Sequence, residues 1–184
     1  MQKRRPSSPN VDDSQADQRF FLKAWLGAAA FAALVVAIDQ VLKTWAVDNL
    51  REKVIHVGDF LDLALVYNKG VAFGLGEGAA PILVAIAIGG MLVVFFAKKI
   101  RLTPLAVMGV GLVLGGAFGN VIDRVFRDTG GAVVDFVDFG WWPVFNFADA
   151  AIVIGSVLLV IWGSRNTDER EQDHDGGSSE KDAE

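Results

Sequence analysis

Four long apolar segments constrain the fold of this chain more than any other feature of its sequence. They cover roughly residues 20–46, 79–97, 103–122 and 142–162. Each approaches or exceeds the length of about 20 residues that a helix needs to cross roughly 30 Å of hydrocarbon. Hydrophobic residues make up 52% of the chain and its mean hydropathy is +0.38, which exceeds what a soluble domain of this size normally carries. The sequence therefore predicts an all-α integral membrane protein with four transmembrane helices.

The segments outside these helices are polar. Residues 48–78 mix charges and glycines with short stretches such as Phe60 to Tyr67, a pattern typical of strands and turns. We expect a small β-like element there. Residues 1–18 and 165–184 are too hydrophilic to bury a core and are predicted to be a disordered cytoplasmic leader and an acidic, disordered cytoplasmic tail. One domain, residues 19–164, lies between them.

Charge and rare residue types exclude several classes of site. From Arg165 onward, 8 acidic and 3 basic residues account for the whole formal net charge of −5, so the acidity belongs to the tail. The chain has no cysteine and only two histidines, His56 and His174. Thiol catalysis and thiolate metal sites are therefore excluded, and a histidine-based zinc site or a Ser-His-Asp triad has almost no material. We expect no metal, no cofactor and no nucleic-acid partner.

Basic residues beside the apolar segments predict the orientation in the membrane. Those on one side of the membrane are Lys3, Arg4, Arg5, Arg19, Lys23, Lys98, Lys99, Arg101 and Arg165. The opposite loops contain Arg51, Lys53, Lys69, Arg124 and Arg127. This moderate bias places both termini in the cytoplasm and the β-like element on the extracytoplasmic side.

Polar side chains on three of the predicted helices converge at one depth. At about 1.5 Å per residue, Asp39 lies roughly 24 Å along the first helix from Lys23, near the outer boundary of the membrane. The same depth is reached by Lys43 one turn further on, by Asn120 and Asp123 at the end of the third helix, and by Asn146 and Asp149 about one to two turns into the fourth. Such convergence is expected of a shared site near the outer leaflet.

Each of these polar groups has a structural and a chemical interpretation. Asp39 and Lys43 are four residues apart in the order that favours pairing, so an ion pair that seats the helix is the preferred interpretation. Asp123 and Arg124 are likewise expected to form a structural pair. Asp149 lies inside an apolar span, where an ionisable side chain is harder to explain by packing than an amide, and this favours a function.

Small and aromatic residues in the spans have structural interpretations. The glycines within residues 109–119 lack the lysine and the flanking strand of a phosphate-binding loop, and we expect them to let neighbouring helices approach closely. Trp141, Trp142 and Trp162 lie at the two ends of the fourth segment, as interfacial anchors do, and Pro143 suits a first helical turn.

Five motifs are spread over roughly residues 35–152. They are Asp39-Gln40 with Lys43, Asn68-Lys69-Gly70-Val71-Ala72-Phe73-Gly74, Gly115-Gly116-Ala117-Phe118-Gly119-Asn120 running into Ile122-Asp123-Arg124, Val133-Val134-Asp135-Phe136, and Phe145-Asn146-Phe147-Ala148-Asp149. In content and order they resemble those of the bacterial lipoprotein signal peptidases, the signal peptidase II family of aspartic intramembrane endopeptidases. Neither tail matches the family.

The resemblance implies a four-helix membrane protease that removes signal peptides from prolipoproteins by cutting just before a cysteine that carries diacylglyceryl. The catalytic pair that it implies is Asp135 and Asp149. The supporting or substrate-binding residues that it implies are Asp39, Lys43, Asn68, Gly70, Asn120, Asp123, Arg124 and Asn146. The expected partners are prolipoprotein signal peptides and membrane lipid, and the expected form is a monomer in the bacterial cytoplasmic (inner) membrane.

Two features depart from the family pattern. The segment between Asp135 and Asp149, which should help to close the site, is short beside that of many members. Asp138 follows Asp135 by three residues and is an alternative catalytic carboxylate, but the Val-Val-Asp-Phe context favours Asp135.

The implied chemistry is physically coherent. Two close carboxylates share one proton because like charges at short range do not both ionise easily, so one activates water while the other protonates the leaving nitrogen. Asn120, Arg124 and Asn146 are candidate orienting or oxyanion-side donors. Residues 48–78 would hold the substrate peptide as an added strand. Each buried CH₂ of the lipid contributes about 0.8 kcal/mol, which keeps the scissile bond at the headgroup boundary.

Two hypotheses from other classes remain open at the level of sequence. A small proton-coupled transporter or flippase would use Asp39, Lys43 and Asp149 as a relay, and it predicts polar groups staggered through the full bilayer. The inner halves of the helices are too apolar for that pattern. A scaffold held by buried polar pairs predicts that substitution of the carboxylates damages folding rather than turnover.

Overall fold

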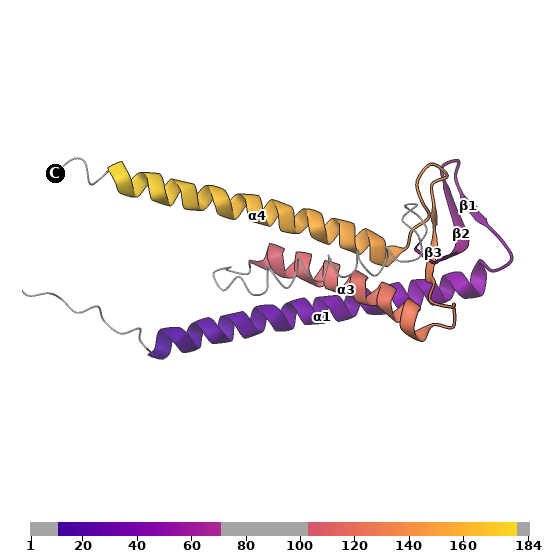
Figure 1. The fold of residues 1–184 in the computed structure, drawn as a ribbon, viewed down its shortest axis with the longest axis horizontal. Coiled ribbons are helices and arrows are strands. Elements are labelled where there is room, and N and C mark those ends of the chain that lie inside the picture. Colours follow the sequence, from indigo (N-terminus) through magenta and orange to yellow (C-terminus); the bar gives the residue numbers. More distant parts are fainter. Residues whose placement is uncertain (1–10, 71–102, 180–184) are drawn as a thin grey trace, which may run out of the picture.

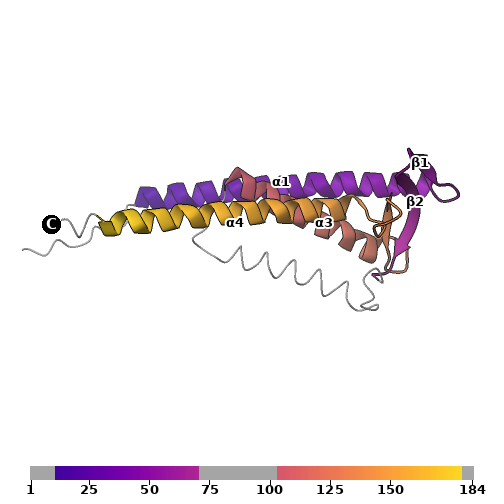
Figure 2. The ribbon, with the colours of Figure 1, turned by 90° about the horizontal axis from the view of Figure 1, so that it is seen from above.

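The computed structural model of the chain describes residues 11–70 and 103–179, which form three helices and three strands. In chain order these are α1 (Val11–Asn49), β1 (Ile55–Val57), β2 (Leu61–Asn68), α3 (Pro104–Phe126), β3 (Val133–Asp138) and α4 (Phe147–Ser179). The helices run alongside one another, and the strands lie together at one end of them (Figure 1). A view turned by 90° shows the same arrangement (Figure 2).

All three described helices are long and apolar enough to cross a membrane, over Gln18–Asn49, Pro104–Phe126 and Phe147–Arg165. The predicted span at 79–97 lies outside the described residues. The structure therefore shows three of the four predicted spans, together with the predicted small sheet.

α3 packs against both α1 and α4, whereas α1 and α4 contact each other much less. Glycines make this close packing possible. A Cβ atom on Gly115 would lie 2.6 Å from Cβ of Val35 on α1, and one on Gly116 would overlap the carbonyl oxygen of Ala148 on α4. The prediction that these glycines allow close helix packing is confirmed.

α4 begins at Phe147, five residues later than the predicted start at 142. Pro143 lies before the helix rather than in its first turn, so that prediction was wrong. The cause is a contact that spans the preceding loop: Phe145 forms an antiparallel bridge with Val137, and its N–H donates to the Val137 carbonyl at 3.1 Å. Residues 138–144 are thereby held as the turn of a hairpin and are not free to join the helix.

Two helices extend beyond the predicted domain boundaries. α1 begins at Val11 and α4 continues to Ser179, so the structure has helical backbone at residues 11–18 and 165–179, two stretches that the sequence analysis expected to be disordered. Adding a residue to an existing helix needs no new nucleus. Residues 11–18 contain the good helix formers Gln and Ala, and residues 165–179 contain Arg, Glu and Gln.

The sheet is antiparallel with the order β1-β2-β3. β1 pairs with the start of β2 through Ile55 and Leu63, and the end of β2 pairs with the start of β3 through Asn68 and Val133. An irregularity in register separates the two parts of the β2–β3 ladder, between Leu63 and Val66. The sequence indicated strands in 48–78 but not β3, which brings Asp135 into the sheet.

A small apolar core joins the sheet to the end of α1. Ala46 of α1 and Leu50, which follows the helix, pack with Val134 and Phe136 of β3, and all four are buried. The sheet is therefore fixed against the helices at the end where the polar side chains gather.

Candidate active site

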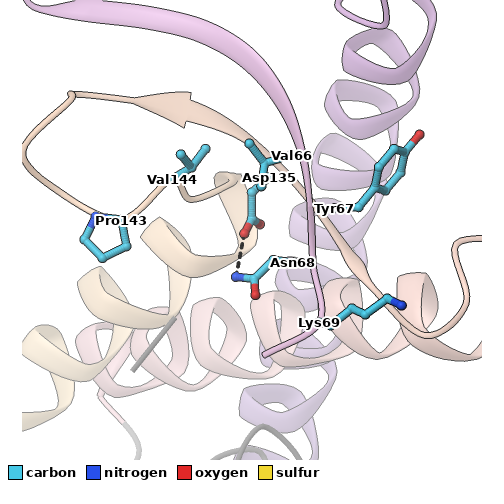
Figure 3. A pocket seen from close by; sticks show the side chains of 7 residues that line it. All are labelled: Val66, Tyr67, Asn68, Lys69, Asp135, Pro143 and Val144. Carbon is cyan, nitrogen blue, oxygen red and sulfur yellow. Dashed lines mark hydrogen bonds between the residues drawn. The ribbon is translucent and has the colours of Figure 1, made fainter. Parts of the chain in front are cut away.

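Asp135 lies on β3 and is almost fully buried. In the ladder it is opposite Val66, so Asn68 is its diagonal neighbour on the same face of the sheet. The Asn68 amide Nδ2 donates to Oδ2 of Asp135 at 2.8 Å (Figure 3). The Asn68 side-chain oxygen in turn accepts from the N–H of Gly70 at 2.8 Å, where the positive φ of 88° suits glycine. The chain turn after β2 thus fixes one donor to Asp135.

Asn146 provides the second donor to Asp135. The Val137–Phe145 bridge brings residue 146 back beside β3, and Asn146 Nδ2 donates to Oδ1 of Asp135 at 2.6 Å. The Asn146 side chain is fully buried. Both oxygens of the Asp135 carboxylate therefore accept an amide hydrogen bond.

Asn146 and Asp149 form a reciprocal capping arrangement at the start of α4. The Asp149 N–H donates to the Asn146 side-chain oxygen at 3.0 Å, and the Asn146 N–H donates to Oδ2 of Asp149 at 3.2 Å. The two residues were predicted one to two turns inside this helix, but Asn146 precedes its first residue and Asp149 lies in its first turn. A carboxylate at that position is favoured by the helix dipole.

Asn120 of α3 links Asp149 to the polar cluster below it. Its Nδ2 donates to Oδ1 of Asp149 at 2.8 Å, and its side-chain oxygen accepts from Asn146 Nδ2 at 3.2 Å. The same oxygen accepts from Lys43 Nζ at 2.9 Å. Asn146 is thus hydrogen-bonded to both Asp135 and Asp149, and the hydrogen bond to Asn120 orients the side-chain amide of Asn146.

Burial raises the pKa of Asp135 from 3.8 to about 6. The hydrogen bond from Asn68 opposes this rise, and the nearby negative charge of Asp149 adds to it. The carboxylate of Asp149 is therefore close enough for its negative charge to act on Asp135.

Lys43 is the centre of a buried ionic cluster. Its Nζ lies 2.9 Å from Oδ2 of Asp39 and 2.9 Å from Oδ2 of Asp123, and all three side chains are 0% exposed. The expected Asp39–Lys43 pair is thus present within α1. The other oxygen of Asp39 accepts from the Ala148 N–H at 3.0 Å, which ties α1 to the first turn of α4.

Asp123 pairs with Arg127 and not with Arg124, so that part of the sequence interpretation was wrong. Arg127 Nε lies 3.0 Å from Oδ1 of Asp123, and Arg127 Nη2 donates to Gln40 Oε1 at 3.0 Å. Within the described part of the chain, the side chain of half-buried Arg124 makes no hydrogen bond or ion pair. A residue four positions on faces the same side of a helix, whereas an adjacent residue is turned away.

Gln40 and Arg127 are the residues that the sequence analysis did not single out. Gln40 stands in a recognised motif, but its amide contacts became evident only in the structure: Nε2 donates to the Gly119 carbonyl at 3.1 Å and to Oδ1 of Asp123 at 3.3 Å. The i,i+4 spacing of Asp123 and Arg127 was available as a signal for Arg127.

A cavity of about 450 Å³ opens beside Asp135. Its lining residues come from the end of β2, from β3 and from the loop before α4 (Figure 3). They are Val66, Tyr67, Asn68, Lys69, Asp135, Pro143 and Val144. Asp149 is not among them and is hydrogen-bonded to Asn146.

Asp138, the alternative carboxylate, lies apart from this cluster. The β2–β3 register pairs it with Asp62 at the far end of β3, and its Oδ1 accepts from the Gly140 N–H at 2.7 Å in an exposed turn. Among the side chains that the structure describes, no group of three or more His, Asp or Glu is arranged to hold a metal ion. The geometry therefore assigns no metal ligand among these residues.

The fold and the site together define a membrane protein with several spanning helices and, at one end of them, two aspartates that are both hydrogen-bonded to Asn146. A family model described as Signal peptidase (SPase) II matches residues 31–164. The chain belongs to this family of aspartic peptidases and is a hydrolase that processes lipoproteins.

Individual relatives agree with this assignment. A lipoprotein signal peptidase of Rhodococcus jostii (strain RHA1) is 44% identical over 135 residues, which cover 71% of this chain and 68% of the relative. One of Mycobacterium leprae (strain Br4923) is 40% identical over 161 residues, covering 83% and 78%. A solved structure described as a bacterial membrane enzyme is 32% identical with a TM-score of 0.62, covering 76% of this chain and 88% of that one. The transporter hypothesis receives no support from these relatives.

Proposed function

We propose that Asp135 and Asp149 are the catalytic pair of this signal peptidase. The observation that carries the proposal is the position of Asn146, which donates through its side chain to Asp135 and through its backbone to Asp149. One carboxylate, ionised, takes a proton from water, and the other, protonated, gives its proton to the leaving nitrogen of the scissile bond. The raised pKa of Asp135 supports a shared proton at working pH.

The remaining polar residues fall into two proposed roles. Asn120 and Asn146 orient the carboxylates, while Asp39, Lys43 and Asp123 hold α1, α3 and α4 together behind them. The residues proposed to face the substrate are Asn68 and Gly70 at the end of β2, and Arg124, whose guanidinium makes no hydrogen bond or ion pair among the described residues. Arg124 is thus able to donate to substrate oxygens.

The proposed substrate is a prolipoprotein whose conserved cysteine carries diacylglyceryl, cut just before that cysteine. The cavity beside Asp135 is lined by Val66 to Asn68, which pair with β3 on one edge of β2. Among the described residues, β1 pairs with the other edge only at Leu61–Leu63, so an extended peptide can add beside Val66 to Asn68. The diacylglyceryl chains stay in the bilayer because leaving it costs about 0.8 kcal/mol for each CH₂. The site therefore has to operate at the membrane surface.

We place the protein in the bacterial inner membrane as a monomer, with both termini in the cytoplasm and the site near the outer leaflet. The start of α1 and the end of α4 lie at the opposite end of the helices from the sheet, which supports a common side for both termini (Figures 1 and 2). Exposed Trp141 and Trp142 next to the site are suited to the headgroup region. The catalytic domain is proposed to be residues 19–164.

Asparagine substitutions test the catalytic pair, because they keep the shape of the side chain and remove its acid-base function. We expect Asp135→Asn and Asp149→Asn each to abolish cleavage of a diacylglyceryl-modified precursor by the purified protein in detergent. Asp138→Asn, three residues along the same strand, is the matched control and is expected to cleave normally. The unmodified precursor should remain uncut by all proteins. Cleavage retained in either of the first two variants would reject this pair.

A further inference from the structure

Arg127 links the end of α3 to α1, and it belongs to none of the motifs found in the sequence. It is the residue that follows the last turn of α3, and its own N–H donates to the Asp123 carbonyl. Its guanidinium bonds Asp123 on the same helix and Gln40 on α1 at 3.0 Å each. Its side chain is 20% exposed, whereas that of Asp123 is 0% exposed. The guanidinium therefore lies between water and the buried side chains of Asp39, Lys43 and Asp123.

The two oxygens of Asp123 face different partners. Oδ1 accepts from Arg127 and Gln40, on the outer side of the cluster. Oδ2 accepts from Lys43 and also from the N–H of Val134 at 3.0 Å. Val134 is the residue immediately before Asp135 on β3, so the orientation of the Asp123 carboxylate determines where this strand is held.

The charge balance of the buried cluster also depends on Arg127. Asp39 and Asp123 contribute two negative charges, and Lys43 and Arg127 contribute two positive charges, so the buried cluster is neutral only when Arg127 is included. An excess charge in such a cluster is poorly screened because the groups are shielded from water. Without Arg127, the excess would be negative and would lie beside two carboxylates that have to share one negative charge.

We propose that Arg127, held by Gln40, is a positioning residue for the catalytic pair: it fixes the Asp123 carboxylate that holds β3 and balances the charge behind Asp135 and Asp149. The inference rests on the proposed catalytic pair. It distinguishes Arg127, which acts through other residues, from Arg124, which is available to the substrate.

The test compares Arg127→Gln with Arg165→Gln, which removes the same charge from an exposed site at the other end of the α4 span. Purified proteins in detergent are assayed for kcat and KM on a diacylglyceryl-modified precursor across pH. We expect kcat of Arg127→Gln to fall about tenfold to a hundredfold, because small displacements of reacting groups have effects of that size. KM should change little, and Arg165→Gln should match the unmodified protein.

The pH profile is the readout that a purely structural role would not move. The groups facing Asp135 are Asn68 from β2, Asn146 and Asp149 from the start of α4, and Lys43 from α1, with Asp39 and Asp123 behind Lys43. Extra negative charge makes the second ionisation of the pair harder. The limb of the profile that reports this ionisation should therefore move to higher pH in Arg127→Gln.

Equal kinetics and an equal pH profile for Arg127→Gln and Arg165→Gln would overturn the proposal. If Arg127→Gln does not fold, Arg127→Lys decides, because it keeps the charge but does not reach both partners with one planar group. A folded Arg127→Lys protein with lowered kcat supports the proposal. A fully active one, or one that also fails to fold, overturns it. Loss of cleavage in Asp135→Asn and Asp149→Asn separately tests the catalytic pair.

Discussion

Asn146 shows how one residue can serve folding and chemistry together. Its side-chain oxygen and backbone N–H cap α4 through Asp149, and the remaining amide hydrogens reach Asp135 and Asn120. A capping aspartate is an ordinary feature of helix N-termini. What makes Asp149 a candidate catalyst is that its capping partner also bonds a second carboxylate.

The raised pKa of Asp135 leads to a pH-dependent stability. Asp135 binds its proton more tightly in the folded protein than in the unfolded chain, where the pKa is near 3.8. Stability contributed by this residue is therefore lost as pH rises from about 4, and the loss is complete above about 6. The shift corresponds to at most about 3 kcal/mol.

Asp135→Asn should remove this dependence, because asparagine does not ionise. We expect the melting temperature of Asp135→Asn in detergent, minus that of the unmodified protein, to become more positive as pH increases from 4 to 7. A difference between Asp135→Asn and the unmodified protein that is constant with pH would contradict a raised pKa.

At the scale of elements, α3 is the helix on which the site depends. Its glycines bring it close to α1 on one side and α4 on the other, and its last turns carry Asn120 and Asp123. The same face that allows close packing near the middle of the helix therefore presents the polar residues at its end. Packing distance and site geometry are coupled through this helix.

Gly116→Ala is expected to separate α3 from α4. The added methyl group would meet the carbonyl oxygen of Ala148, a backbone atom that has no room to move, and Ile152 Cγ1 at 2.8 Å. Overpacking of this kind costs about 1–3 kcal/mol. Because Ala148 precedes Asp149, we expect both thermal stability and cleavage to fall, the latter by about tenfold or more.

Gly27→Ala on α1 is the control for this substitution. A Cβ atom there would lie 3.5 Å from Val107 of α3, an ordinary contact. Cleavage and melting temperature should both stay close to those of the unmodified protein. Equal effects of the two substitutions would show that the site does not depend on the α3–α4 distance.

At the scale of the whole molecule, the site is assembled at one end of the bundle from the end of α1, the end of α3, the start of α4 and the sheet (Figure 1). The helical extensions beyond the spans lie at the opposite end. The backbone of residues 11–18 and 165–179, which continues α1 and α4, is thus remote from the aspartates.

A shortened protein of residues 19–164 should therefore cleave the modified precursor at a rate within about threefold of the full chain, since distant surface changes usually have small effects. Activity and folded yield in detergent are the measurements. Ending the chain at residue 154 instead removes part of the α4 span and should abolish folded protein. Loss of cleavage by the 19–164 protein, when it is folded, would assign the ends a role in catalysis.

The amino-acid sequence by itself determined the membrane class, the approximate positions of the three described spans, and that Asp39, Asn120 and Asp149 lie close together toward one end of them. These follow from segment length, apolar composition and helical rise, which are local properties. Only the tertiary structure decided that β3 joins the sheet, that Asn146 caps α4 while bonding Asp135, and that Asp123 forms an ion pair with Arg127 and not with Arg124. Each of these depends on where distant backbone segments meet, and the loop closed by Val137 and Phe145 sets that meeting point.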